Sequence, residues 1–259
     1  MDTTEKWNGE AGHYQAAFSK GGNDYNRSLI DFLRDECGLA PGSRVIDIGC
    51  GVGKYGVYLA RMGCEVTLND ISPKMLEYAA KNMGETGAAW HSLCGDWRDI
   101  PRNAPELGQK FDIAMSTMSP AVNDIETVAK MSAVTDGWCL LTRFYKWDSP
   151  LRNELCRRLQ LPEKPMFSDL EGDCAEMTRC VSAAGFVPLV KYVPYDWCDR
   201  RSPQDAADRF ISRYYDGQAN GAEAGRVAAA ALELADENGY VEDAVNTRVA
   251  WIYWNTKGQ

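Results

Sequence analysis

The sequence has few of the residues and patterns that define several protein classes. It contains only two histidines in 259 residues, and its nine cysteines include no Cys-x-x-Cys pair. Scattered cysteines in a chain of this length indicate reduced thiols and not a disulfide framework. No apolar run approaches the ~20 residues of a membrane span, and the first residues lack the basic and apolar regions of a signal peptide. We therefore expect a cytoplasmic protein.

Excess positive charge is also missing. Lys and Arg total 28 against 37 Asp and Glu, which gives a net charge of −9. A chain of this charge repels a phosphate backbone, and the Arg pairs at 157–158 and 200–201 are too short to form a basic patch. We expect no nucleic-acid partner. The length and the composition, with 45% hydrophobic residues, predict a single domain over residues 1–259.

The middle of the chain alternates short β-rich runs with amphipathic helical stretches, a pattern typical of a parallel sheet covered by helices on both faces. The predicted strands are 44–48, 65–69, 88–94, 111–116, 138–144, 186–193 and 246–254. The predicted helices are 10–20, 25–37, 54–62, 73–83, 122–133, 173–184, 203–216 and 222–236. Pro188 cannot donate a ladder hydrogen bond, so its strand is predicted to lie at an edge.

The remaining segments are predicted to surround this sheet. Residues 1–40 are expected to form an N-terminal helical cap or lid, and residues 44–144 a cofactor-binding core. Residues 145–172, which contain three prolines, and residues 203–240 are expected to be insertions that shape the substrate site.

A glycine-rich turn, Gly49-Cys-Gly-Val-Gly53, follows the first predicted strand. Glycine lets the backbone approach a ligand closely because it tolerates positive φ and has no Cβ. Gly51, Gly53 and Gly56 satisfy the pattern GxGxxG, and Asp70 lies about 20 residues downstream, as in dinucleotide-binding folds. An NAD(P)-dependent oxidoreductase is therefore one candidate.

Asp47 favours a different ligand. A carboxylate at the carboxyl end of the first strand repels a pyrophosphate but suits an ammonium or a sulfonium, and S-adenosylmethionine carries both. The phosphate-binding pattern GxxxxGK[ST] fails, because Ile48 stands where the first glycine is needed and Tyr55 where the hydroxyl residue is needed. A cationic cofactor is thus favoured over a nucleotide.

Two separated runs agree with one family. The runs Val45-Ile-Asp-Ile-Gly-Cys-Gly-Val-Gly53 and Leu68-Asn-Asp-Ile-Ser-Pro-Lys-Met-Leu76 resemble the class I S-adenosylmethionine-dependent methyltransferases, and the resemblance spans residues 44–144. It implies a Rossmann-like, doubly wound α/β fold whose seven-stranded sheet is ordered 3-2-1-4-5-7-6 with the last strand antiparallel. N-terminal helices and a helical insertion before the last strand would complete this fold. S-adenosyl-L-methionine is the implied cofactor.

The resemblance also implies the cofactor contacts. Asp47 would reach the methionine ammonium, and Asp70 would accept hydrogen bonds from both ribose hydroxyls. Asp96 would accept from the adenine amino group, Trp97 would flank the ring, and Ser116 would lie near the methyl group. The full implied set is Asp47, Gly49, Cys50, Gly51, Gly53, Asp70, Ile71, Met75, Asp96, Trp97 and Ser116.

Methyl transfer to a small-molecule acceptor needs mainly correct positioning, and it requires neither a metal nor a covalent intermediate. A hydroxyl acceptor would also need a base, for which the imidazoles are His13 and His91. His13 lies beside Tyr14 in the predicted lid. Arg143 and Tyr145 are expected at the carboxyl edge of the sheet, where ligands of open α/β sheets bind. These are candidates, and no catalytic residue is assigned.

Some alternatives stay open at this point. The pair Ser119-Pro120 partly resembles the (D/N/S)PP(Y/F) motif of enzymes that methylate amino groups of nucleic acids, but the second proline and the aromatic residue are absent. A protein that binds S-adenosylmethionine without catalysis would carry the same motifs. The acceptor atom and the oligomeric state are not determined by these patterns.

Overall fold

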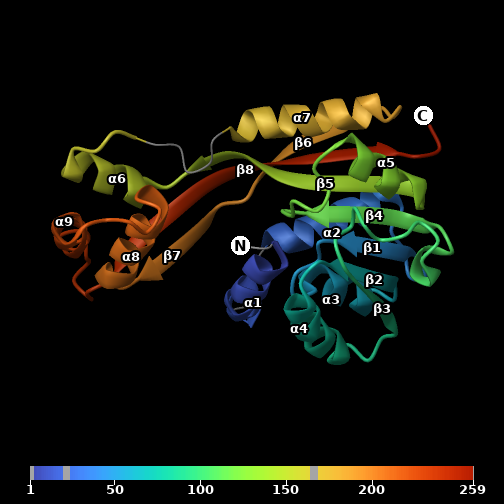
Figure 1. Ribbon diagram of the computed structural model, residues 1–259, viewed down its shortest axis with the longest axis horizontal. Helices are drawn as coiled ribbons and strands as arrows, with labels where there is room; N and C mark the ends of the chain where they lie inside the picture. The colour runs from blue at the N-terminus through green and yellow to red at the C-terminus, as the bar shows by residue number, and fades with distance from the viewer. Residues whose placement is uncertain (1–2, 20–23, 164–168, 259) are drawn as a thin grey trace. The chain divides into compact units, whose positions relative to one another are not determined.

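A computed structural model describes residues 3–19, 24–163 and 169–258 (Figure 1). Its helices are α1 Thr3–Ser19, α2 Asp24–Cys37, α3 Lys54–Arg61, α4 Pro73–Gly84, α5 Ile125–Ala133, α6 Pro150–Leu159, α7 Leu170–Ala183, α8 Pro203–Tyr214 and α9 Gly221–Leu232, with a short 3-10 helix at Pro105–Leu107. Its strands are β1 Arg44–Ile48, β2 Glu65–Asp70, β3 Trp90–Cys94, β4 Phe111–Thr117, β5 Thr135–Asp148, β6 Leu189–Pro194, β7 Trp197–Arg201 and β8 Val241–Asn255.

The sheet has the order β3-β2-β1-β4-β5-β8-β6. The pairs β1–β2, β1–β4, β2–β3 and β4–β5 are all parallel. With β8 as the seventh strand, this order confirms the predicted 3-2-1-4-5-7-6 arrangement. An eighth strand, β7, was not predicted and pairs antiparallel with β8. As predicted from Pro188, the strand that follows it, β6, lies at an edge.

The central strands are buried because helices cover them. Val45, Ile46 and Ile48 of β1 have almost no exposed surface, which is typical of a parallel strand packed on both faces. On α4, the sequence spacing predicts a buried stripe of Met75, Leu76, Ala79, Ala80 and Met83. Four of these residues are buried, but Ala80 is exposed. The remaining polar residues of these strands are therefore held in a dry environment, where an unpaired charge is costly.

The chain divides into two compact units. Unit 1 comprises residues 1–143, 173–191 and 250–259, and unit 2 comprises residues 144–172 and 192–249. Both predicted insertions, residues 145–172 and 203–240, fall entirely within unit 2. Residues 1–2, 20–23 and 164–168, parts of the predicted lid and of the first insertion, lie outside the described residues.

Helix α6 and strand β7, both in unit 2, were not predicted. Ser149 caps α6 by accepting a hydrogen bond from the amide of Arg152, and Pro150 stands at its first turn. That proline is one of the three in residues 145–172, which are predicted to be an insertion, and no helix was predicted there although proline is common at this position of a helix. All nine cysteines are free thiols, as predicted. In the described part of the chain, none of the helices is both long enough and apolar enough to span a membrane.

Candidate functional site

The glycine-rich turn is tied to the end of β2. The amides of Gly49 and Cys50 both donate to the Asn69 carbonyl, at 2.8 and 2.9 Å. The Gly51 amide donates to a carboxylate oxygen of Asp70 at 2.8 Å. These bonds bring the carboxyl ends of β1 and β2 to one edge of the sheet, where ligands of open α/β sheets bind.

Two glycines of the turn allow close approach of neighbouring elements. Gly53 has φ +76°, and a Cβ there would lie 3.0 Å from the Cβ of Ala79, so its hydrogen lets α3 pack against α4. Gly49 has φ +71°, and a Cβ there would lie 1.9 Å from the hydroxyl oxygen of Ser119. A side chain at Gly49 would meet both backbone strain and a steric clash.

Asp47 is the most unusual group at this edge. Its side chain is fully buried, and neither carboxylate oxygen has a hydrogen-bond partner among the described residues. Burial, with a smaller effect from the charge of Asp70, raises the pKa of Asp47 from 3.8 to about 7. A buried carboxylate without a partner is strongly disfavoured, so the position suits a cation or a hydrogen-bond donor supplied from outside the chain.

Asp70 differs from Asp47 because the protein partly satisfies it. Its two oxygens accept the amides of Gly51 and Ser72, at 2.8 and 2.9 Å. Burial raises its pKa, and these backbone hydrogen bonds oppose the rise. Each carboxylate oxygen can accept a second hydrogen bond, so Asp70 can still bind a pair of hydroxyls.

Three further residues of the predicted cofactor set lie around these carboxylates. Cys50 is buried, and burial raises the pKa of its thiol well above the usual value. Ile71 is half-buried just after β2. Met75 is buried in a small cluster with Ala11 of α1 and Val52 of the turn, so part of its surface packs against the protein.

The last three predicted residues already have protein partners. An oxygen of Asp96 accepts the amide of Arg98 at 2.9 Å, which leaves acceptor capacity on its carboxylate. Trp97 is 1% exposed, and the ammonium of Lys130 lies 4.7 Å from its ring centroid. The Ser116 hydroxyl donates to the Ile48 carbonyl at 2.8 Å. Contacts of these side chains with a cofactor stay predictions.

Helix α1 packs on α4 beside the turn. The side-chain oxygen of Asn8 accepts the Ser72 hydroxyl at 2.7 Å, next to Asp70 in sequence. Gln15 and Asn82 exchange two amide hydrogen bonds, at 2.9 and 3.1 Å. Sequence patterns gave no signal for Asn8, because its partner is 64 residues away.

Two of the catalytic candidates lie on α1. His13 is exposed, and its ring makes an edge contact with that of Tyr14, with centroids 6.3 Å apart. Desolvation, followed by the charges of Glu10 and Asp70, raises the pKa of Tyr14. Near neutral pH this phenol is therefore a hydrogen-bond donor and not a base. The effect of Asp70 also indicates that Tyr14 lies on the side of α1 near the turn.

The other two catalytic candidates belong to different units. Arg143 of unit 1 donates to the carbonyls of Thr142 and Val122, and burial lowers its pKa to about 10. It therefore remains charged at neutral pH. Tyr145 of unit 2 packs against Tyr192, with ring centroids 4.4 Å apart. A catalytic role for these residues stays a prediction.

A strained residue follows β4, and sequence patterns did not single it out. Met118 has φ +50°, an unfavourable value for a residue with a side chain. The carbonyl and the hydroxyl of Thr142 both accept its amide, at 3.2 and 3.1 Å. Backbone strain of this kind clusters at functional sites, and Met118 lies two residues after Ser116, which is predicted to lie near the methyl group.

Comparison with known proteins decides the family. Residues 45–136, which contain the turn and both carboxylates, match the family model described as a methyltransferase domain. The chain contains a class I methyltransferase domain. The predicted family is thereby confirmed, and this family is S-adenosylmethionine-dependent.

Relatives of the methyltransferase domain are similar over part of their length. A ubiquinone biosynthesis O-methyltransferase from Azoarcus is 37% identical over 25% of this chain and 28% of its own length. A protein-L-isoaspartate O-methyltransferase from Gloeobacter violaceus is 29% identical over 36% of this chain and 43% of its own. The chain thus spans less than half of either relative. Other matches include a ribosomal RNA methyltransferase, so the relatives differ in their acceptors.

Solved structures of methyltransferases share the fold. The magnesium protoporphyrin IX methyltransferase from Synechocystis, solved with bound S-adenosylhomocysteine, has a TM-score of 0.53 and 18% identity. The superposition covers 74% of this chain and 90% of that one. At this identity the similarity shows that the two proteins share a fold. It does not show that they share a methyl acceptor.

Proposed function

We propose that this protein is a cytoplasmic S-adenosylmethionine-dependent methyltransferase that acts on a small-molecule acceptor by in-line transfer. The observation that carries the proposal is Asp47, whose buried carboxylate has no hydrogen-bond partner among the described residues. An ammonium from the cofactor would neutralise this charge. The unpaired carboxylate of Asp47 is unfavourable in the free protein, and binding of a specific cation would remove this cost.

The residues at the turn fit this cofactor. Asp47 would hold the ammonium, and Asp70 would use its remaining acceptor capacity for the ribose hydroxyls. Gly49 and Gly51, both with positive φ, let the backbone pass close to the bound molecule. When bound, S-adenosylmethionine supplies a methyl group on a sulfonium, from which a nucleophile displaces a neutral thioether. Two carboxylates at one edge would instead repel the pyrophosphate of a dinucleotide.

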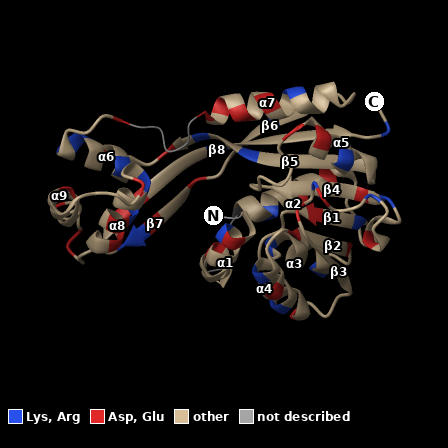
Figure 2. Cartoon of the chain, in the orientation of Figure 1, with Lys and Arg blue, Asp and Glu red and all other residues tan. Residues whose placement is uncertain are grey.

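The charge of the chain favours a small acceptor over a nucleic acid. The net charge is −9, and on α4 and α7 acidic and basic residues are interspersed (Figure 2). Binding to a phosphate backbone relies on clustered Lys and Arg, which these helices lack. The acceptor site would then recognise its ligand by the shape of the pocket and by a few polar groups, as most small-molecule pockets do.

Parallel calorimetric titrations with S-adenosylmethionine and NAD test the proposal. We expect saturable binding of S-adenosylmethionine, and a loss of affinity of about 10-fold or more in Asp70→Asn, which weakens a charged hydrogen-bond acceptor. Glu65→Ala is the matched control, because Glu65 lies at the opposite end of β2 and its side chain is 70% exposed. Binding of NAD alone would overturn the assignment. Binding of S-adenosylmethionine without methyl transfer to any acceptor in cell extract would reduce it to a cofactor-binding protein.

A further inference from the structure

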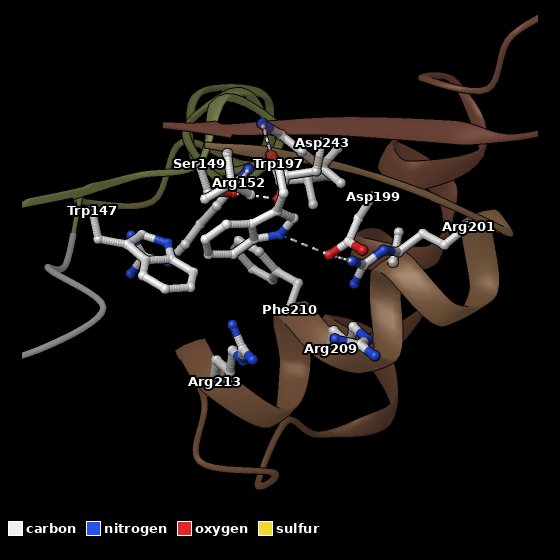
Figure 3. A pocket seen from close by; sticks show the side chains of 14 residues that line it. Trp147, Ser149, Arg152, Trp197, Asp199, Arg201, Arg209, Phe210, Arg213 and Asp243 are labelled. Carbon is white, nitrogen blue, oxygen red and sulfur yellow. Dashed lines mark hydrogen bonds and ion pairs between the residues drawn. The ribbon is translucent and has the colours of Figure 1, made fainter. Parts of the chain in front are cut away.

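Unit 2 contains a pocket whose lining includes none of the residues assigned to the cofactor site. The pocket has a volume of about 150 Å³ and is enclosed by α6, α8, β7, β8 and the end of β5 (Figure 3). A cavity of this size accommodates a molecule comparable to benzene. All of its lining residues belong to unit 2, so the pocket is a feature of that unit alone.

The residues that form the walls of the pocket follow the periodicity of the strand and the helix on which they lie. On β7, alternate residues share one face, and on α8, residues three and four apart share one face. The strand contributes Trp197, Asp199 and Arg201, and the helix contributes Ala206, Arg209, Phe210 and Arg213. Buried residues of α6, α8 and α9 form a separate core around Leu155 and Phe210. This core gives the pocket a supported wall.

The lining carries more positive than negative charge. Four arginines, at positions 152, 201, 209 and 213, face two aspartates, Asp199 and Asp243. This excess is local, since the chain as a whole has a net charge of −9. Basic residues are also visible on α6 and β7 in Figure 2. The pocket therefore favours an anion within an acidic protein.

Both aspartates are committed to internal partners. Asp243 accepts the Ser149 hydroxyl at 2.7 Å and the Leu151 amide at 3.2 Å, and so holds the first turn of α6. Asp199 accepts the indole N–H of Trp197 at 3.2 Å and forms an ion pair with Arg201. These carboxylates help to position the walls, and two of the arginines that line the pocket, Arg209 and Arg213, lie on α8.

Arg209 and Arg213 add positive charge to the pocket. Desolvation and the positive charges of Arg209 and Arg201 lower the pKa of Arg213, and the charges of Asp199 and Asp243 oppose this effect. Arg209 forms an ion pair with Asp205 at 3.6 Å, and because Asp205 is half-exposed, solvent screens this pair. Figure 3 shows the guanidinium of Arg213 directed toward the indole rings. A bound anion would relieve the repulsion among these cations.

Aromatic rings complete the pocket. The indoles of Trp147 and Trp197 pack edge to face, with centroids 4.8 Å apart and an interplanar angle of 74°. Phe210 is buried on α8 beside them. Such rings bind a flat apolar molecule through stacked or edge contacts, while a guanidinium binds a carboxylate with two parallel hydrogen bonds.

We propose that this pocket binds a small aromatic carboxylate, with the carboxylate on Arg209 and Arg213 and the ring against Trp147 and Trp197. The guanidinium fork matches a carboxylate in geometry as well as in charge. The volume limits the ligand to about one ring within the walls. The pocket contains no residue of the glycine-rich turn, so the ligand would not need S-adenosylmethionine for any of its contacts.

Titration of the full chain with benzoate, followed by tryptophan fluorescence and calorimetry, tests this site. We expect one saturable site, with affinity reduced about 10-fold or more in Arg213→Gln, because a charged hydrogen bond is lost. Arg179→Gln is the matched control, since Arg179 lies on α7 in unit 1, where it forms an ion pair with the exposed Glu176. Asp47→Asn should bind benzoate normally, which separates this site from the cofactor site.

Three further probes decide the ligand class. Benzamide tests the need for negative charge, cyclohexanecarboxylate tests the need for an aromatic ring, and inorganic phosphate tests for a simple anion site. Benzoate should bind more tightly than all three. No saturable binding of benzoate, equal binding of benzamide or phosphate, or unchanged binding in a folded Arg213→Gln protein would overturn the proposal. Thermal unfolding of each variant confirms that it is folded.

Discussion

Asp47→Asn is expected to weaken S-adenosylmethionine binding by about 30-fold or more, because the amide cannot neutralise a buried ammonium. The same substitution is expected to stabilise the ligand-free protein. Asn has nearly the shape of Asp, and the carboxylate has no hydrogen-bond partner among the described residues that the change would remove. A neutral amide costs less to bury than a carboxylate. Loss of binding and gain of stability would thus occur together.

The gain in stability should depend on pH. Burial and the charge of Asp70 raise the pKa of Asp47 from 3.8 to about 7. A carboxyl whose pKa is raised by folding contributes stability that is fully present below its unfolded value and is lost as the pH rises through its folded value. The advantage of the Asn variant should therefore grow from about pH 5 to about pH 8, toward an upper limit of roughly 4 kcal/mol.

Chemical denaturation of both proteins at the two pH values measures this difference. Asp136→Asn on β5 is the control, because that side chain is exposed. The control should show the same stability relative to wild type at both pH values, and unchanged cofactor affinity. A stability difference between Asp47→Asn and wild type that did not change with pH would show that Asp47 titrates normally, contrary to its burial.

Gly49→Ala is expected to destabilise the protein by roughly 2–5 kcal/mol and to abolish cofactor binding, because it combines backbone strain with overpacking. Gly49 has φ +71°, and the added Cβ would lie 1.9 Å from the Ser119 hydroxyl oxygen and 2.8 Å from its Cβ. Gly38 offers a matched control, since it has the same φ of +71° but no neighbour within 4 Å of an added Cβ. Gly38→Ala should show the backbone cost alone, about 1–2 kcal/mol.

Denaturant unfolding and cofactor titration of both alanine variants separate the two effects. Gly38→Ala should bind S-adenosylmethionine as wild type does, because Gly38 lies after α2 and outside the turn. A loss of stability in Gly49→Ala that only equalled that of Gly38→Ala would mean that Ser119 moves away at no cost. The turn would then be less tightly packed than the structure indicates.

The sheet order could be predicted from the resemblance to a known family, and the turn from local patterns. The strand that contains Asp47, the glycines after it and Asp70 at the end of the next strand are readable from the sequence. Strand β7 was missed because its sequence, Trp197-Cys-Asp-Arg-Arg201, is charged and its pairing with β8 is distant in sequence. Helix α6 was missed although Ser149-Pro150 is a common helix start, because the three prolines of residues 145–172 were taken together as the mark of an insertion.

The state of the site residues could not be predicted from spacing. That Asp47 lacks partners while Asp70 accepts two amides depends on which backbone groups the fold brings near each carboxylate. The burial of Trp97 against Lys130 and the strain at Met118 likewise depend on packing across the sheet. Sequence patterns identify residue types at an edge, whereas hydrogen-bond satisfaction is a property of the folded chain.

Proton release during cofactor binding tests the role of Asp47 most directly. At about pH 6.5 the amino group of S-adenosylmethionine is charged, while Asp47, with a pKa of about 7, is mostly protonated in the free protein. Calorimetric titrations in two buffers of different ionisation enthalpy count the protons exchanged. We predict release of about half a proton or more per cofactor bound, and none from Asp47→Asn. Binding of wild type without proton release, or unweakened binding by the variant, would contradict the assignment of Asp47 to the cofactor cation.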